Sequence, residues 1–106
     1  MVIKNFQPKR SEQIAFTVTF SGAVNFTSFE LAAKKSYKDT SYSIYRNLEN
    51  GITKINDTTY QVTIPTNNLE YTSYIYDARV VIDSVPYFPF SGKITVKPSV
   101  YEVYNG

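Results

Sequence analysis

The chain of 106 residues contains no histidine, no cysteine and no tryptophan. Without cysteine it has neither a disulfide framework nor a thiolate metal site. Without histidine it has no imidazole to act as a general base or a metal ligand, which excludes catalytic triads and most transition-metal sites. Asp77 and Asp83 share one strand face but lie about 20 Å apart by the strand rise, too far for a glycosidase pair. We therefore expect no enzyme and no cofactor.

Two further absences concern location. Residues 1–13 lack the apolar segment of a signal peptide, and no apolar run approaches the ~20 residues that span a bilayer. We therefore expect a soluble single domain, made in a reducing cytoplasm, with no membrane partner. The net charge of +2 is too small to indicate a basic surface that attracts nucleic acid.

Aromatic residues, by contrast, are abundant, with ten tyrosines and seven phenylalanines. Tyrosine has an apolar body and a polar tip, so it suits both half-buried strands and protein interfaces. We expect most of these rings to pack between strands. A tyrosine-rich minority gathered on one face would mark a contact surface.

Alternation of apolar and polar residues runs through most of the chain and predicts antiparallel strands. It is clearest in residues 12–20, 28–36, 55–64 and 73–82. Asn50-Gly51 is the strongest hairpin signal, and Asn56-Asp57 predicts a second turn. About seven short strands without an amphipathic helix favour a two-sheet antiparallel sandwich, with a partly open small barrel as the alternative.

The last two predicted strands carry the most regular pattern. Every second residue of the first strand shares one face: Tyr74, Tyr76, Ala78, Val80 and Ile82. The return strand offers Phe90, Ile94 and Val96 as inward residues, and Gly92 predicts a bulge or bend between them. Tyr74 or Tyr76 is the candidate for a tyrosine corner, in which the hydroxyl bonds back to the backbone of the preceding turn.

Two basic groupings raise the alternative of single-stranded nucleic-acid binding, since both are interleaved with aromatic residues. They are Lys4, Lys9 and Arg10, and then Lys34, Lys35 and Lys38. A solvated face with lysines protecting strand edges explains them equally, and the small net charge favours that explanation. Ser91-Gly92-Lys93 lacks the upstream glycine of a phosphate-binding loop. Asn56-Asp57-Thr58 is interpreted as turn chemistry rather than as a glycosylation acceptor.

A short sequence pattern in the last third of the chain also occurs in other proteins. It consists of a leucine before a turn, a Tyr-x-Tyr-Asp strand and a closing Ser-Gly-Lys-aliphatic-x-Val-x-Pro strand. The positions are Leu69, Tyr74, Tyr76, Asp77, Ser91, Gly92, Lys93, Ile94, Val96 and Pro98. The pattern resembles small β-sandwich proteins of tailed bacteriophages, among them the immunoglobulin-like N-terminal domain of baseplate upper proteins and related head or tail accessory proteins. Ser11-Glu12 and Ser73 stand where such proteins often carry Gly-Asp and Gly.

The resemblance implies an all-β fold: one antiparallel immunoglobulin-like β-sandwich of about seven strands over residues 1–106. It also implies a non-enzymatic virion protein, synthesised in the cytoplasm of the bacterial host. We expect an auxiliary capsid (decoration) protein that docks on the head lattice, with the major capsid protein as partner. The first alternative is a baseplate, tail or head-fibre attachment module that contacts tail or fibre proteins. The second is a carbohydrate- or nucleic-acid-binding module.

Both ends of the chain are candidate docking arms, residues 1–11 and 98–106. In the C-terminal segment valine and tyrosine residues alternate in pairs, a pattern that suits the addition of a strand to a neighbouring protein. The residues concerned are Val100, Tyr101, Val103 and Tyr104. Many copies on a lattice would turn weak individual contacts into stable attachment. Terminal disorder is the alternative for both segments.

Overall fold

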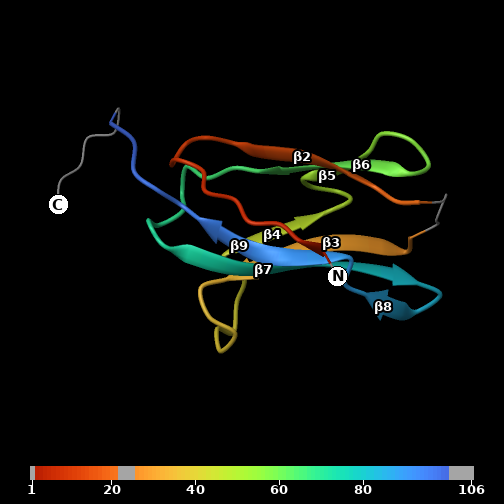
Figure 1. Ribbon diagram of the computed structural model, residues 1–106. Helices are drawn as coiled ribbons and strands as arrows, with labels where there is room; N and C mark the ends of the chain where they lie inside the picture. The colour runs from red at the N-terminus through yellow and green to blue at the C-terminus, as the bar shows by residue number, and fades with distance from the viewer. Residues whose placement is uncertain (1, 22–25, 101–106) are drawn as a thin grey trace.

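The computed structural model describes residues 2–21 and 26–100, and these form nine β-strands and no helix (Figure 1). In chain order the strands are β1 (Val2–Ile3), β2 (Ile14–Thr19), β3 (Ser28–Lys34), β4 (Ile44–Asn47), β5 (Ile52–Lys54), β6 (Thr59–Ile64), β7 (Ser73–Ile82), β8 (Val85–Tyr87) and β9 (Phe90–Thr95). The predicted all-β class is confirmed. The count exceeds the predicted seven because β1 and β8 are strands of two and three residues, too short to show an alternating pattern.

The strands form two sheets that lie face to face (Figure 1). The larger sheet has the order β1-β9-β7-β3-β4, with β8 also paired to β7, and the smaller has the order β2-β6-β5. The named strand pairs are antiparallel except for β1 with β9. The predicted two-sheet arrangement is therefore confirmed, and its pairing is antiparallel as predicted apart from the β1–β9 pair.

The core lies between the sheets, where alternation places the apolar side chains. In β3 the side chains of Phe29, Leu31 and Ala33 are fully buried. This burial overrides the helix propensity of the same segment, because a helix would not put alternate residues on one face. An aromatic cluster fills one end of the core, with ring centres 4.8 to 5.9 Å apart. Its members are Phe20, Phe26, Phe29 and Tyr60.

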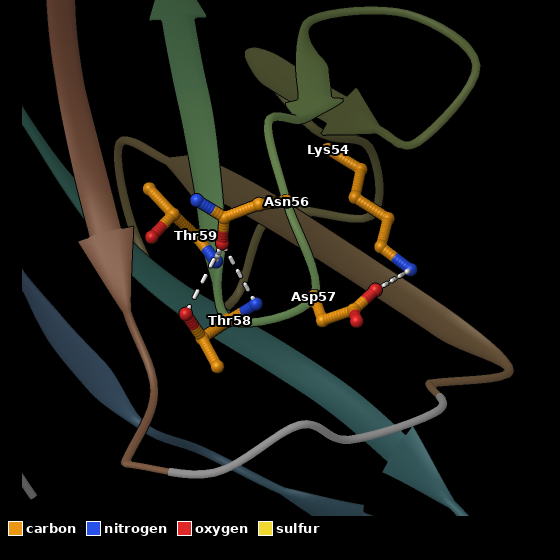
Figure 2. Close-up of polar contacts among 5 residues, drawn as sticks. All are labelled: Lys54, Asn56, Asp57, Thr58 and Thr59. Atoms are coloured by element: carbon orange, nitrogen blue, oxygen red, sulfur yellow. Dashed lines mark hydrogen bonds and ion pairs between the residues drawn. The ribbon is translucent and has the colours of Figure 1, made fainter.

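The loop between β5 and β6 is organised by the side chain of Asn56 (Figure 2). Its Oδ1 accepts hydrogen bonds from the backbone N–H groups of Thr58 (3.0 Å) and Thr59 (2.9 Å), and from the Thr58 hydroxyl (3.1 Å). Lys54 Nζ lies 3.7 Å from Asp57 Oδ1 across the same loop. The predicted turn at Asn56-Asp57 is confirmed, and the Asn56 side chain stabilises it.

The turn at Asn50-Gly51 is present, with Gly51 at a φ of +104°, but it does not close a hairpin. β4 belongs to the larger sheet and β5 to the smaller, so the chain changes sheets here. The Arg46 side chain lies against Gly51, and its Nε donates a hydrogen bond to the Thr63 carbonyl of β6 at 2.8 Å. The hairpin prediction is wrong because a turn signal specifies a chain reversal and not the sheet that each flanking strand joins.

The first residues of the chain form part of the larger sheet instead of an N-terminal arm. After β1, backbone hydrogen bonds to β9 and the residues beyond it continue as far as residue 10. They join Lys4 N to Ser91 O (2.8 Å), Phe6 N to Lys93 O (2.9 Å) and Arg10 N to Lys97 O (2.9 Å). The prediction of an arm over residues 1–11 is thus corrected for residues 2–10, because the edge of β9 offers partners to their backbone groups.

The predicted C-terminal arm lies mostly outside the described residues. Of its four candidate residues, Val100 is described and is 90% exposed. Tyr101, Val103 and Tyr104 lie beyond the part of the chain that the structure describes. The docking role of this segment remains a prediction.

Gly92 sits in regular register, opposite Tyr76 of β7, so the predicted bulge or bend at this position is wrong. The glycine is required by a close approach instead. A Cβ at Gly92 would lie 1.9 Å from the Lys4 carbonyl oxygen. The same oxygen accepts a hydrogen bond of 2.6 Å from the Tyr76 hydroxyl. Gly92 and Tyr76, side by side on neighbouring strands, together hold the N-terminal segment on the sheet.

Tyr76 also gives the fold a pH dependence. Burial raises its pKa from 10.0 to about 12, because the phenolate would be poorly solvated. The stabilisation is therefore fully present below pH 10 and is lost as the pH rises toward 12. We expect Tyr76→Phe to reduce this alkaline loss in urea unfolding measured at a series of pH values, and to cost about 1–2 kcal/mol at neutral pH through the missing hydrogen bond. Equal alkaline slopes in the two proteins would contradict the assignment.

Candidate functional site: an aromatic groove

The outer face of the larger sheet, turned away from the core, carries a hollow of about 210 Å³. We call it the aromatic groove and define it by the side chains that line it: Glu30, Ala32, Lys34, Tyr37, Tyr42, Tyr45, Ile75, Asp77, Arg79 and Phe88. Two of the strands that supply it, β3 and β7, alternate between core and groove. The residues that fill the core thus fix which residues face the groove.

The floor of the groove follows from the register of three neighbouring strands. Ala32 of β3 lies opposite Tyr45 of β4 on one side and opposite Asp77 of β7 on the other. Because the alanine side chain is a single methyl group, it leaves open space between the tyrosine and the aspartate. The groove exists because a small residue occupies the centre of this row.

One wall of the groove is a pair of stacked tyrosines. The rings of Tyr42 and Tyr45 have their centres 5.4 Å apart and are inclined by only 13°. Lys34 Nζ lies 5.7 Å from the centre of the Tyr42 ring, within the range of a cation–π contact. Tyr37 and Phe88, also exposed, complete the aromatic lining. Four exposed aromatic side chains thus surround one hollow, and such a gathering marks a binding surface.

Glu30 is fixed in place by two neighbours. Its carboxylate accepts a hydrogen bond from Arg79 Nη2 at 2.6 Å and another from the Tyr45 hydroxyl. The bond from Tyr45, followed by the one from Arg79, lowers the pKa of Glu30, and the same contact raises the pKa of Tyr45. Glu30 therefore stays ionised at neutral pH and positions the ring and the guanidinium, with no proton to donate.

Asp77 is the acceptor that remains available at the groove floor. Its side chain is exposed, and within residues 2–21 and 26–100 no hydrogen bond or ion pair engages its carboxylate. Arg79 lies two residues along on the same strand face but is directed to Glu30. The groove thus offers aromatic faces, one free carboxylate and a balanced set of charges, with two acidic and two basic side chains.

The other residues of the predicted motif serve the scaffold. Leu69 is buried at the corner before β7. Tyr74, near the start of β7, accepts a hydrogen bond at its hydroxyl from the Glu70 backbone N–H at 2.9 Å. Tyr76 and Gly92 hold the N-terminal segment. Among Leu69, Tyr74, Tyr76, Asp77 and Gly92 of this pattern, Asp77 is the one whose side chain is exposed in the groove.

The basic groupings are partly occupied by contacts within the chain. Arg10 Nε donates to the Asn67 carbonyl at 3.2 Å, and its guanidinium lies 5.1 Å from the Tyr71 ring centre. Lys35 forms an ion pair with Glu70, which raises the pKa of the lysine. These contacts favour the solvated-face explanation, and the absence of a nucleic-acid partner stays a prediction.

In the described part of the chain, no three acidic side chains lie close enough together to hold a metal ion. The same residues contain no helix with the length and apolar character needed to cross a membrane.

Comparison with known proteins adds a likeness of fold. No protein-family profile and no curated protein matches the sequence. Among solved structures the chain is similar to part of an endo-fucoidan hydrolase of glycoside hydrolase family 107, with a TM-score of 0.54 and 13% sequence identity. The match covers 94% of this chain and 13% of the hydrolase. At this identity the likeness concerns the fold alone.

Proposed function

We propose that the chain is a non-enzymatic attachment module of a tailed-phage particle, an immunoglobulin-like β-sandwich that decorates the capsid by docking on the head lattice. The observation that carries the proposal is the aromatic groove, which gathers exposed tyrosines and a phenylalanine beside a fixed arginine on one open sheet face. The sequence resemblance to virion β-sandwich proteins supplies the class of partner.

The strand order supports the immunoglobulin-like part of the proposal. β9-β7-β3-β4 corresponds to the G-F-C-C′ order of a variable-type sheet, and β2-β6-β5 to the B-E-D order of its partner. β7 is then strand F, and the bond from Glu70 to Tyr74 lies where a tyrosine corner is found, with the hydroxyl accepting from a backbone N–H.

The composition of the groove supports docking on a protein. Aromatic residues and arginine are enriched in protein interfaces and dominate their energetic hot spots. The rings of Tyr42 and Tyr45 are already stacked, and Glu30 holds both Tyr45 and Arg79. Little side-chain freedom would be lost on docking, which favours affinity. Attachment at the baseplate, tail or head fibre would use the same face.

Tyr42→Ala tests the docking role, because Tyr42 is 57% exposed and its ring contacts are confined to the groove. We expect binding to purified heads that lack the protein, measured by co-sedimentation, to weaken by roughly 30-fold, the size of a hot-spot truncation. The unfolding temperature should stay within a few degrees of that of the unmodified protein.

Tyr87→Ala is the matched control, since Tyr87 is also exposed, at 51%. Tyr87 lies opposite the buried Val80, so its side chain projects from the face of the larger sheet that is opposite to the groove. Tyr87→Ala should bind to the purified heads as tightly as the unmodified protein does. Equal binding by all three proteins would remove the groove from the proposal. Binding to tails and not to heads would select the attachment alternative.

A neutral saccharide is a second candidate ligand for the groove, favoured by two observations. The exposed stacked rings offer flat apolar faces, and the unengaged Asp77 carboxylate can accept hydrogen bonds from hydroxyl groups. Titration with a panel of neutral oligosaccharides, monitored by NMR, would detect such binding. Shifts confined to the groove and abolished by Asp77→Ala would support this candidate over docking on a protein.

A further inference from the structure

Strand β2 forms an edge of the smaller sheet that lacks the usual protection. It pairs with β6 on one side, and on its other side no strand of the described residues pairs with it. Its six residues contain no charge, no proline and no glycine. Natural edge strands are normally short, bulged or charged, because exposed backbone groups invite another strand.

The other edges of the two sheets are protected in these ways. β1 has two residues and is followed by Lys4, β5 has three residues including Lys54, and β4 carries Arg46. β8 has three residues and contains Pro86. Among the described strands, β2 is therefore the edge best suited to accept a further strand.

The register identifies the backbone groups that are free on β2. The Phe20 N–H donates to the Thr58 carbonyl of the adjoining chain segment at 2.8 Å. Since hydrogen-bonding direction alternates along a strand, Phe16 and Val18 face β6 with their backbone groups. By the same alternation, the N–H and C=O groups directed to the open edge are those of Ala15, Thr17 and Thr19.

The core is also incompletely covered beside this edge. Phe16 and Val18 point toward the core, yet both remain partly exposed. Phe16 contacts Phe90 of β9 at a centroid distance of 5.9 Å, so the β1–β9 edge lies on the same side of the sandwich. There Val2 and Ile3 are 57% and 70% exposed. An added strand at β2 would reduce the exposure of this side.

We propose that the occupant is β2 of a second copy of this chain, paired antiparallel about a two-fold axis at Thr17. In that register Thr17 faces its own copy, Ala15 faces Thr19, and Phe16 faces Val18. All the free backbone groups of each strand then find partners. Thr–Thr and aromatic–β-branched pairs are among the favourable cross-strand pairs, and no residue of β2 itself opposes a like charge because the strand has none.

This self-complementarity is what selects a second copy over an unrelated strand, because an isologous interface requires one patch to fit itself. The two smaller sheets would join into a single continuous sheet. The aromatic groove lies on the outer face of the other sheet and would stay open in both copies. The dimer is thus independent of the docking proposal and would present two grooves to a repeating surface.

Thr17→Lys tests the pairing, since it places two lysines opposite each other at the axis. Gln61→Lys is the matched control: Gln61 lies opposite Thr17 on β6, on the same outer face, but away from the edge. In sedimentation equilibrium we expect dimers for the unmodified protein and for Gln61→Lys. The dimer of Thr17→Lys should be at least tenfold weaker, while its far-ultraviolet circular dichroism should match that of the unmodified protein.

Amide hydrogen exchange separates this interface from any other. Ala15 and Thr19 are present in both the unmodified protein and Thr17→Lys. Their N–H groups should be protected in the dimer of the unmodified protein and should exchange rapidly in Thr17→Lys at the same concentration. A monomer at every accessible concentration would overturn the proposal. So would a dimer in which these amides exchange rapidly, or one that Thr17→Lys leaves equally tight.

Discussion

Replacing Gly92 with alanine is expected to lower the free energy of unfolding by about 2–3 kcal/mol, near the upper end for overpacking a well-filled site. The added Cβ would lie 1.9 Å from the oxygen and 2.8 Å from the carbon of the Lys4 carbonyl. Both are backbone atoms, so no side-chain rotation relieves the contact. The N-terminal segment must move off β9, and the hydrogen bond from Tyr76 to Lys4 is then lost.

Urea unfolding measures this effect, and Lys93→Ala is its control because Lys93 is the exposed neighbour of Gly92 on the same strand. The control should change the stability by less than about 0.5 kcal/mol. In Gly92→Ala the amides of Lys4 and Phe6, which donate to Ser91 and Lys93, should also exchange faster. A Gly92→Ala protein as stable as the unmodified one would show that the N-terminal segment is not held at this point.

Phe29→Ala is expected to have the largest effect on stability, a loss of about 3–5 kcal/mol. Phe29 is completely buried at the centre of the aromatic cluster, with the Phe20, Phe26 and Tyr60 rings 5.4 to 5.9 Å away. Deleting the ring removes these contacts and leaves a cavity that the surrounding strands cannot fully close.

The matched control is Phe88→Ala, which deletes the same ring from a site that is 47% exposed. It should cost less than about 1 kcal/mol, as the ring lies at the edge of the groove and partly in water. Thermal unfolding followed by near-ultraviolet circular dichroism reports both variants. Similar losses at the two positions would contradict the placement of Phe29 in the core.

Much of the fold follows from the alternation of apolar and polar residues in the sequence. The shared faces of residues 28–34 and 73–82 follow from which alternate positions are apolar, and the structure buries these faces except at Ile82, which is partly exposed at the end of β7. The turn at Asn56 follows from its side-chain chemistry. These features are local, because each depends on residues only a few positions apart.

Pairing between distant segments could not be read in the same way. The parallel contact of residues 2–10 with β9 joins the two ends of the described chain, and no pattern within either segment specifies it. Gly92 therefore suggested a bulge, although its partner is the Lys4 carbonyl. The Asn50-Gly51 turn likewise showed a reversal without showing that the chain changes sheets.

The aromatic groove illustrates both cases. Alternation alone places Glu30, Ala32 and Lys34 on the outward face of one strand, and Asp77 and Arg79 on that of another. Their assembly around one hollow depends on the register between strands, which puts Ala32 between Tyr45 and Asp77. The contributions of Tyr37, Tyr42 and Phe88 come from connecting segments, whose positions alternation does not predict.

Immunogold labelling of virions purified from the source, viewed by electron microscopy, tests the proposed function most directly. Gold distributed over the heads is the predicted result and would agree with capsid decoration through a repeated docking face. Gold confined to the tail or its tip would instead support the alternative of a baseplate or fibre attachment module. Virions without any label, from a culture in which the protein is present, would contradict a structural role in the particle.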